Sequence, residues 1–229
     1  MRQPSLAPAV STALALLAAC FLGAAPAHAA GSVGAQQVVV RGGDLLYGDN
    51  GRVCTVGFNA RSSTTTYALL AGHCLSTGTT WYADPGRTIP VGVTDAVSFP
   101  SDDYGVVRYT NPSVARPGEV SLGGGAVRDI TGVTAPRVGQ SVCHVGRVGG
   151  LRCGTVTAIN VTVSYGGGTV YGLFRSNACL EPGDTGGPAF SGTTALGLLV
   201  GGSGNCSSGG VAYYQPVVEV LSAYGLTVY

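Results

Sequence analysis

Three short stretches of the sequence combine residue types that can perform nucleophilic chemistry. The stretch AGHC contains His73, and the stretch SDDYG contains Asp103, which follows 30 residues later. The third stretch, EPGDTGGP, holds the hydroxyl of Thr185 among three glycines. A histidine base that is oriented by a carboxylate can activate a hydroxyl, and backbone N–H groups freed by glycines can bind the developing negative charge. Together the three stretches indicate acyl transfer through a threonine nucleophile.

Each of these residues also has a purely structural interpretation. A single histidine is more often a packed or surface side chain than a catalyst, and the pair Asp102-Asp103 is also typical of a solvated turn. The catalytic interpretation of His73 is supported only by the acidic pair and the glycine-rich motif in the same chain. His144, which follows Cys143, has no such companions, and we expect it to be a surface residue next to a disulfide.

The residues between these stretches favour short strands. Glycine occurs 38 times, and short apolar runs alternate with Gly, Asn and Pro without a sustained helical period. One helix is expected near the end, where Pro216 lies at a first turn and Gly225 just past the last. The sequence therefore predicts an all-β protein with a short C-terminal helix. The expected strands lie within residues 53–60, 66–71, 105–109, 154–165, 169–174 and 195–200.

The first 29 residues are typical of an export signal. An arginine precedes an apolar run, and Ala27-His28-Ala29 is a cleavage site of the small-x-small type. The alternative is a lipoprotein, because the stretch that ends at Cys20 resembles a lipobox, although the apolar run continues beyond it. No later apolar run reaches the ~20 residues that span a bilayer. We therefore expect a secreted, extracellular protein without membrane contact after signal removal.

Four segments are expected along the chain. Residues 1–29 are the signal peptide, and residues 30–39 are a short pro or linker segment. The stretch 111–132 is rich in Pro, Gly and Ser, and it separates two halves of similar size. We place these halves at 40–115 and 116–229.

Six cysteines remain after signal removal. An even number in an exported chain indicates three disulfides, although six cysteines allow 15 pairings. A zinc site is the alternative, but the spacings C-x-x-C and H-x(3–5)-H are both absent from the sequence. We prefer pairs of sequence neighbours. Each pair closes a loop of roughly 10 to 30 residues, which contributes about 3 kcal/mol through chain entropy. The preferred pairs are Cys54–Cys74, Cys143–Cys153 and Cys179–Cys206.

The charge of the chain argues against several classes of partner. Arginine and lysine total 12 against 11 acidic residues, and charged residues make up only 10% of the sequence. Such a chain lacks the basic patches that bind nucleic acid or an anionic membrane surface. We expect no cofactor and no metal.

In this arrangement the sequence resembles the chymotrypsin-like serine peptidases, and within them the small secreted bacterial streptogrisin and α-lytic protease type. The resemblance runs from about Val40 to Tyr229. Several motifs match in the order of the family, so the similarity is more specific than a single GDxGGP would be. These motifs are residues 70–74, 99–111 and 181–188, GGSGNC at 201–206 and LSAYG at 221–225.

The resemblance implies two antiparallel six-stranded Greek-key barrels with the site at their interface. His73 would be the general base, Asp103 would orient its ring, and Thr185 would be the nucleophile. The N–H groups of Gly183 and Thr185 would form the oxyanion hole. The partner of Asp184 stays open. The resemblance also implies a monomer that acts on peptide or protein substrates.

Substrate preference follows from positions that the resemblance places beside the side chain preceding the scissile bond. Trypsin-like members have an acid where this chain has Asn177, and glutamate-specific members have a histidine where it has Leu199. Gly201 and Gly202 would leave the pocket wall open. We therefore expect cleavage after large or medium apolar residues. The residues expected to bind substrate are Asn177, Leu180, Val200, Gly201 and Gly202.

Three features depart from the family pattern. Thr185 stands where the family has serine, and its β-methyl group restricts χ1. Val200 stands where relatives place a serine that hydrogen-bonds the triad aspartate. Relatives also carry a long pro-region, whereas only residues 30–39 are expected to fill that place here. Two functions stay open: a slow endopeptidase acting through an acyl-enzyme, and a pseudopeptidase that binds peptides or a protein partner without cutting.

Overall fold

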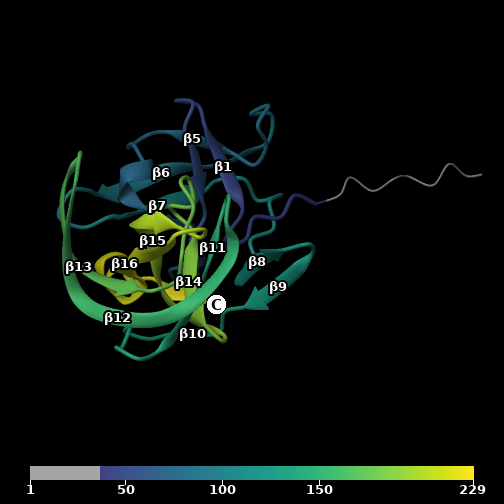
Figure 1. The fold of residues 1–229 in the computed structure, drawn as a ribbon. Helices are drawn as coiled ribbons and strands as arrows, with labels where there is room; N and C mark the ends of the chain where they lie inside the picture. Colours follow the sequence, from purple (N-terminus) through teal and green to yellow (C-terminus); the bar gives the residue numbers. More distant parts are fainter. Residues whose placement is uncertain (1–36) are drawn as a thin grey trace, which may run out of the picture. The chain divides into compact units, whose positions relative to one another are not determined.

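The computed structural model describes residues 37–229, and these residues form a mostly β structure (Figure 1). The predicted signal peptide at 1–29 and most of the predicted pro segment lie outside the described residues. Within residues 37–229, no helix has the length and apolar character required to cross a bilayer.

The first sheet is antiparallel, and its strands surround a core in which Trp81 is fully buried. The Trp81 indole N–H donates to Thr94 Oγ1 at 2.7 Å, so the buried polar atom is satisfied. Among the described residues this sheet has eight strands. In sheet order they are β17 (Thr227–Val228), β3 (Phe58–Arg61), β4 (Thr66–Leu70), β7 (Tyr104–Tyr109), β6 (Pro90–Ser98), β5 (Thr80–Tyr82), β1 (Leu45–Gly48) and β2 (Val53–Thr55).

The second sheet closes on itself, because its strands β15 and β16 also pair with each other. Its longest strand, β12, forms a long hairpin with the next strand, β13, along one side (Figure 1). In the described part of the chain this sheet has seven strands. In sheet order they are β10 (Gly132–Val133), β15 (Thr194–Asn205), β14 (Pro188–Ser191), β11 (Ser141–Gly146), β12 (Gly150–Tyr165), β13 (Gly168–Ser176) and β16 (Gly209–Pro216).

Both sheets curl like barrels, as the resemblance implied, but their strand counts differ from six. In the first sheet, the strand expected at 53–60 is divided into β2 and β3, which flank Val56 and Gly57, and β17 adds one more. In the second sheet, six strands close the ring and β10 attaches in parallel to β15. The prediction of an all-β protein is confirmed.

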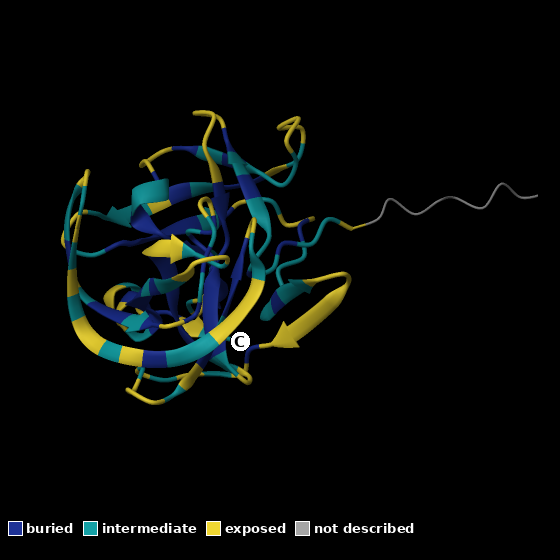
Figure 2. Ribbon diagram, viewed as in Figure 1, coloured by how far each residue is buried: buried dark blue, intermediate teal, exposed yellow. Residues whose placement is uncertain are grey.

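The stretch 111–132, expected to separate the two halves, contains a separate hairpin. Strands β8 (Glu119–Gly123) and β9 (Ala126–Asp129) pair with each other and form a two-stranded sheet. Three consecutive glycines at 123–125 have positive φ and make the turn between them. Figure 2 shows that β9 is exposed along its length, whereas strands such as β7 and β14 inside the two sheets are largely buried. The division into halves at residue 115 stays a prediction, and β17 crosses it, because it joins the first sheet.

The predicted helix is present as α1 (Val217–Tyr224). Pro216 precedes its first turn as the N-cap, one position earlier than expected, and Gly225 ends it in the left-handed conformation at φ 62°. The helix buries Val217, Val220 and Leu221 in a core cluster that also contains residues of both sheets.

The two sheets approach closely at two glycines. A side chain on Gly57, which lies between β2 and β3, would collide with Leu198 Cδ2 of β15. Gly186 has a φ of 97°, and a Cβ there would lie 3.0 Å from the carbonyl oxygen of Thr55. Glycine at these positions lets the loop around residue 185 pack directly against the first sheet.

Candidate active site

Strand pairing brings His73 and Asp103 together. Strands β4 and β7 are neighbours in the first sheet, and Leu70 at the end of β4 is paired with Gly105 near the start of β7. His73 lies in the 3₁₀ turn η1 (Gly72–Cys74) just after β4, and Asp103 directly precedes β7. Both residues therefore lie at the same edge of the sheet.

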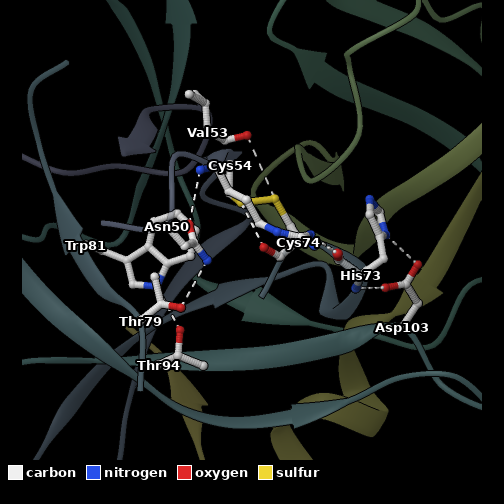
Figure 3. The surroundings of a disulfide bond; sticks show 10 residues. Asn50, Val53, Cys54, His73, Cys74, Thr79, Trp81, Thr94 and Asp103 are labelled. Atoms are coloured by element: carbon white, nitrogen blue, oxygen red, sulfur yellow. Dashed lines mark hydrogen bonds and ion pairs between the residues drawn. A yellow bond between two sulfur atoms is a disulfide. The ribbon is translucent and has the colours of Figure 1, made fainter. Parts of the chain in front are cut away.

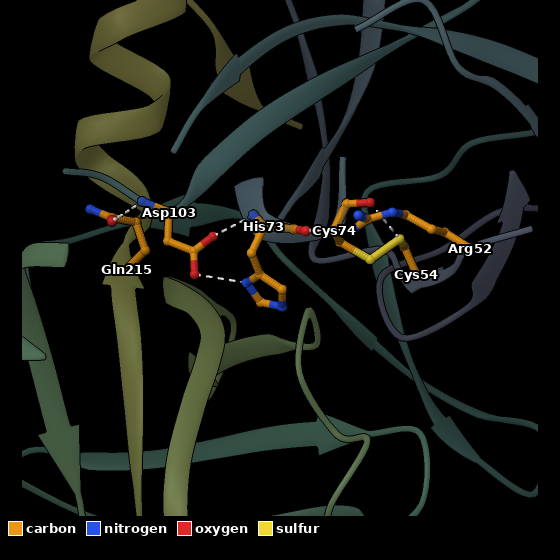
Figure 4. Close-up of polar contacts among 6 residues, drawn as sticks. All are labelled: Arg52, Cys54, His73, Cys74, Asp103 and Gln215. Carbon is orange, nitrogen blue, oxygen red and sulfur yellow. Dashed lines mark hydrogen bonds and ion pairs between the residues drawn. A yellow bond between two sulfur atoms is a disulfide. The ribbon is translucent and has the colours of Figure 1, made fainter. Parts of the chain in front are cut away.

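The two side chains form a hydrogen-bonded pair (Figure 4). His73 Nδ1 lies 2.8 Å from Asp103 Oδ2, and the His73 backbone N–H donates to Asp103 Oδ1, also at 2.8 Å. The Asp103 carboxylate is buried, whereas 30% of the His73 side chain is exposed. Asp102 accepts a hydrogen bond from Ser98 instead. Of the acidic pair, Asp103 is therefore the residue that is hydrogen-bonded to the imidazole.

Gln215 holds Asp103 from the opposite sheet. Its Oε1 accepts the Asp103 backbone N–H at 2.9 Å, and this contact is buried (Figure 4). The Gln215 Nε2 donates to Glu219 Oε2 at 2.5 Å. Burial raises the pKa of Glu219, and the charge of Asp102 adds to this effect. Gln215 was not predicted from the sequence, because a glutamine beside a helix start carries no catalytic signal of its own.

A disulfide fixes the turn that carries His73. Cys74 is bonded to Cys54 of β2, with 6.0 Å between their Cα atoms (Figure 3). The Arg52 Nη1 donates to the His73 carbonyl oxygen at 2.8 Å. The backbone at His73 is therefore held from both sides.

Asp184 anchors the loop that carries Thr185. Its buried carboxylate accepts three backbone N–H groups, those of Val148, Gly149 and Glu181, at 2.7, 2.8 and 2.7 Å. This answers the question that the sequence left open about its partner. Gly183 next to it has a φ of 97°, which a non-glycine residue rarely adopts.

Two backbone N–H groups of this loop are available to a ligand. Among residues 37–229, neither the Gly183 N–H nor the Thr185 N–H donates a hydrogen bond. These are the two groups that the resemblance assigned to an oxyanion hole. The loop beyond them is joined to β15, since the Gly186 N–H donates to the Leu199 carbonyl at 2.6 Å and the Leu199 N–H returns a bond to Gly187 at 2.9 Å.

The Thr185 side chain is partly buried and unpaired. Within the described residues, its hydroxyl makes no hydrogen bond to His73 or to any other residue. The geometry thus brings the loop of Thr185 against the first sheet without joining the two reactive groups. Of the three predicted catalytic residues, His73 and Asp103 are hydrogen-bonded to each other, and Thr185 is hydrogen-bonded to neither.

A cleft of about 330 Å³ lies beside the imidazole. Buried Val200 contributes an isopropyl group to its wall, at the position where the resemblance implied a serine. The aromatic side chains in its wall were not predicted, and a tyrosine before three glycines was the only signal in the sequence for one of them. We call this space the His73 cleft; its lining residues are His73, Phe99, Asp103, Tyr165, Gly167 and Val200.

The predicted substrate-binding residues have different surroundings. Asn177 is exposed, and its side-chain oxygen accepts the Thr155 N–H at 2.7 Å. The wall at the two glycines is less open than expected. A Cβ on Gly201 would lie 2.9 Å from the Tyr165 hydroxyl oxygen, and one on Gly202 would collide with the Leu180 methyl groups.

Three disulfides join the six cysteines of the described residues, in the pairs of sequence neighbours that we preferred. They leave no cysteine thiol in this part of the chain for the alternative zinc site.

His144 lies in the interior, which contradicts its prediction as a surface residue. It is fully buried, because it faces inward on β11, and its Nδ1 lies 2.8 Å from the Tyr214 hydroxyl. The Tyr214 hydroxyl is also bonded to Ser176 Oγ at 2.9 Å. Burial lowers the pKa of His144 to about 4, while the charge of Asp184 raises it and that of Arg152 lowers it further.

Sequence comparison places the chain near several bacterial proteases. It is 50% identical to "Serine protease 2" of Streptomyces fradiae over 173 residues, which are 75% of this chain and 99% of that protein. It is 46% identical to streptogrisin-A of Streptomyces griseus over 191 residues, or 83% of this chain and 61% of that protein. Glutamyl endopeptidase 2 of Streptomyces griseus is 44% identical and covers 83% of this chain and 100% of its own length. No family model matches the chain.

Structural comparison gives the same kind of neighbour. "Alpha-lytic protease homolog N4" has a TM-score of 0.78 and 53% identity, and covers 84% of this chain and 100% of its own. A glutamic-acid-specific serine protease, described as using a histidine triad in substrate binding, also has a TM-score of 0.78, with 44% identity over 83% of this chain and 100% of its own.

Proposed function

The chain belongs to the chymotrypsin-like serine peptidases, in their bacterial streptogrisin-like branch, and we propose that it is an exported endopeptidase with a threonine nucleophile. The observation that carries this proposal is the hydrogen-bonded pair of His73 and Asp103 at the cleft. A buried carboxylate that holds an imidazole through Nδ1 leaves Nε2 free to take a proton. The substrate is a peptide or protein, and the enzyme acts as a monomer outside the cell.

In the proposed reaction, His73 Nε2 removes the proton of the Thr185 hydroxyl as the oxygen attacks the substrate carbonyl. Asp103 keeps the ring oriented and stabilises the imidazolium that forms. The negative charge on the carbonyl oxygen is bound by the N–H groups of Gly183 and Thr185. The imidazolium then gives its proton to the leaving amine, an acyl-threonine remains, and water releases it by the same steps in reverse order.

Threonine makes this enzyme slower than a serine relative. The hydroxyl chemistry is equivalent, but the β-methyl group restricts χ1 and must fit beside the imidazole. An overpacking cost of about 1–3 kcal/mol would slow attack roughly 10- to 200-fold. The Gly186–Leu199 and Leu199–Gly187 backbone bonds hold the loop, so the backbone cannot easily move to relieve the methyl group.

We propose cleavage after apolar residues. Leu199 is fully buried in an apolar cluster, and Asn177 offers no charge to a basic side chain. A relative named glutamyl endopeptidase 2 is 44% identical, so glutamate is the main competing preference. An apolar side chain at position 199 gives a glutamate carboxylate no hydrogen-bond partner there, and an unpaired buried charge is costly.

A specific observation favours a second candidate, a pseudopeptidase that binds peptides or a protein partner without cutting. Among the described residues the Thr185 hydroxyl makes no hydrogen bond to His73, and Val200 gives Asp103 no polar partner. Catalytic hydrogen bonds often tighten only when substrate binds, so this observation is compatible with the first candidate as well.

Turnover of two peptide amides, with Phe or Glu before the cleaved bond, tests the proposal. Wild type should cleave the Phe substrate, and Thr185→Ser should be about 10- to 200-fold faster. Thr64→Ser, at an exposed turn position, is the matched control and should change nothing. A fluorophosphonate should label wild type at Thr185. It should label the Thr185→Ser variant at the same position at a higher rate.

Three results would contradict the proposal. If wild type is unlabelled and inactive while Thr185→Ser is fully active, the chain is a pseudopeptidase. If Thr185→Ser is also inert, the site has lost more than its nucleophile. Preferential cleavage after Glu would overturn the apolar preference alone.

A further inference from the structure

Gln215 connects the second sheet to the residue that orients the imidazole. It lies on β16 and is fully buried, whereas Asp103 directly precedes β7 of the first sheet. The Asp103 backbone N–H donates to Gln215 Oε1 at 2.9 Å. In Figure 4, Gln215 lies on the far side of Asp103 from His73. The amide therefore supports the catalytic pair from behind and does not contact the imidazole itself.

The Asp103 carboxylate depends on its own backbone for alignment. Oδ1 accepts the His73 backbone N–H, and Oδ2 lies against His73 Nδ1, both at 2.8 Å. Within the part of the chain that the structure describes, the carboxylate makes no other hydrogen bond, so no third residue orients it. A displacement of the residue 103 backbone would therefore move the carboxylate relative to the ring.

The Gln215 amide can hold this backbone in only one orientation. A backbone N–H is a donor only, so the amide must turn its oxygen, and not its NH₂ group, toward Asp103. In the opposite orientation two donors would face each other in a buried place, and unpaired buried donors are costly. The oxygen and nitrogen ends of an amide have nearly the same shape, so apolar packing does not choose between them.

Glu219 makes this choice. It lies in the first turn of α1, and its Oε2 accepts a hydrogen bond from Gln215 Nε2 at 2.5 Å. An ionised carboxylate only accepts hydrogen bonds, so it selects the NH₂ end of the amide and leaves the oxygen for Asp103. Asp102, the other acid nearby, accepts from Ser98 Oγ instead. Among residues 37–229, Asp103 and Glu219 are the only hydrogen-bond partners of the Gln215 side chain.

We propose that Gln215 and Glu219 are positioning residues for the His73–Asp103 pair: Glu219 orients the Gln215 amide, and the amide oxygen fixes the backbone of Asp103. The second sheet and the C-terminal helix thereby align a base that the first sheet carries. This inference rests on the proposed function for its effect on kcat, but not for its effect on the His73–Asp103 hydrogen bond.

Three variants test the inference. Gln215→Met removes both hydrogen bonds with little change in side-chain volume. Glu219→Ala removes only the group that orients the amide, whereas Glu219→Gln keeps an oxygen that can accept from Gln215 Nε2. Glu219 as a whole is an exposed residue, so its variants should fold.

Gln140→Met is the matched control. Gln140 Oε1 also accepts a backbone N–H, that of Arg137 at 3.1 Å, but this glutamine precedes β11 and does not line the His73 cleft. Its substitution should leave both readouts below unchanged.

The first readout is the low-field proton NMR resonance of His73 Nδ1–H, which does not require turnover. This proton lies between the ring and Asp103 Oδ2, so a less firmly held carboxylate lengthens the bond and should move the resonance to higher field. Gln215→Met should give the largest shift and Glu219→Ala a smaller one. Glu219→Gln should nearly restore the wild-type position.

The second readout is turnover of the Phe peptide amide. Gln215→Met should lower kcat about 5- to 50-fold, because the buried Asp103 N–H loses its acceptor. Glu219→Ala should lower kcat about 2- to 5-fold, and Glu219→Gln less than about twofold. KM should change little, since neither Gln215 nor Glu219 lines the His73 cleft.

An unchanged His73 resonance in folded Gln215→Met would overturn the inference. Equal losses in Glu219→Ala and Glu219→Gln would also overturn it, because the negative charge at the start of α1, and not the orientation of the amide, would then be responsible. A change in KM alone would likewise contradict it.

Two further results leave the inference decidable. If Gln215→Met does not fold, the comparison of the two Glu219 variants decides. If wild type and every variant lack turnover, the proposed function fails, and the His73 resonance still decides the role of Gln215 and Glu219.

Discussion

The two halves of the site are built differently. On the first sheet, His73 and Asp103 share two hydrogen bonds, and the Cys54–Cys74 disulfide fixes the turn that carries the imidazole. On the second sheet, the loop of Thr185 is equally well anchored through its backbone, but the reactive hydroxyl itself is unpaired within the described residues. Of the three departures from the family pattern, the two at single side chains, Thr185 and Val200, occur in this second half.

The comparison shows that the hydrogen bonds that hold the backbone of a site loop do not also orient the side chain that it carries. Asp184 makes three backbone bonds that keep Gly183 and Thr185 in place whatever side chain residue 185 carries. In the proposed mechanism, the first half supplies the base, and the second half supplies the nucleophile and the oxyanion donors.

Removal of the base should have the largest effect. His73→Ala should lower kcat by about 10⁶-fold. The residues of a catalytic unit act together, so loss of one member costs nearly as much as loss of all. The measurement is single-turnover cleavage of the Phe peptide amide, in wild type and in Thr185→Ser. Thermal unfolding should change little, since the imidazole is partly exposed. Residual activity above about one hundredth of wild type would show that His73 is not the base.

Loss of the Asp184 anchor should affect the second half alone. Asp184→Asn places an amide NH₂ among backbone donors, so the oxyanion groups shift and kcat should fall about 10²- to 10³-fold. Asp95→Asn, at an exposed carboxylate, is the control. The His73 Nδ1–H resonance should be unchanged. A shift of that resonance would show that the two halves are not independent.

Acid should destabilise the second half through His144. Its pKa is lowered to about 4 from the ordinary 6.5, so the unfolded chain binds the proton more readily than the folded one. Stability is therefore complete above pH 6.5 and falls by about 3 kcal/mol as the pH drops to 4. Urea unfolding at several pH values measures this slope. His144→Gln should remove that part of the slope, and an unchanged slope would contradict the assignment.

The smallest effect is expected at Arg52. Its hydrogen bond to the His73 carbonyl is exposed, so Arg52→Ala should lower kcat/KM less than about tenfold. The same substitution in a chain lacking the Cys54–Cys74 bond should cost more, because both supports of the turn are then gone. Equal costs would mean that the disulfide alone fixes the imidazole.

The sequence predicted those parts of the molecule that depend on local pattern. Every predicted apolar run contains residues of a strand, but ten of the seventeen strands of the described residues were not predicted. The ordered motifs led to His73 and Asp103, which the structure joins. The partners that come from distant strands were not predictable. Gln215 and Tyr165 reach Asp103 and its cleft only because β16 and the β12–β13 hairpin fold against the first sheet. His144 was misplaced for the same reason, since nothing local distinguishes an inward from an outward histidine on a strand.

Strand β17 has a consequence for biogenesis. It pairs with β3 of the first sheet. Leu226, which directly precedes β17, is buried in the core cluster shared by both sheets. The Tyr229 hydroxyl donates to the Arg116 carbonyl at 2.6 Å. These residues leave the ribosome after all strands of the second sheet. The sheet that carries His73 can therefore be completed only after all strands of the second sheet have been translated.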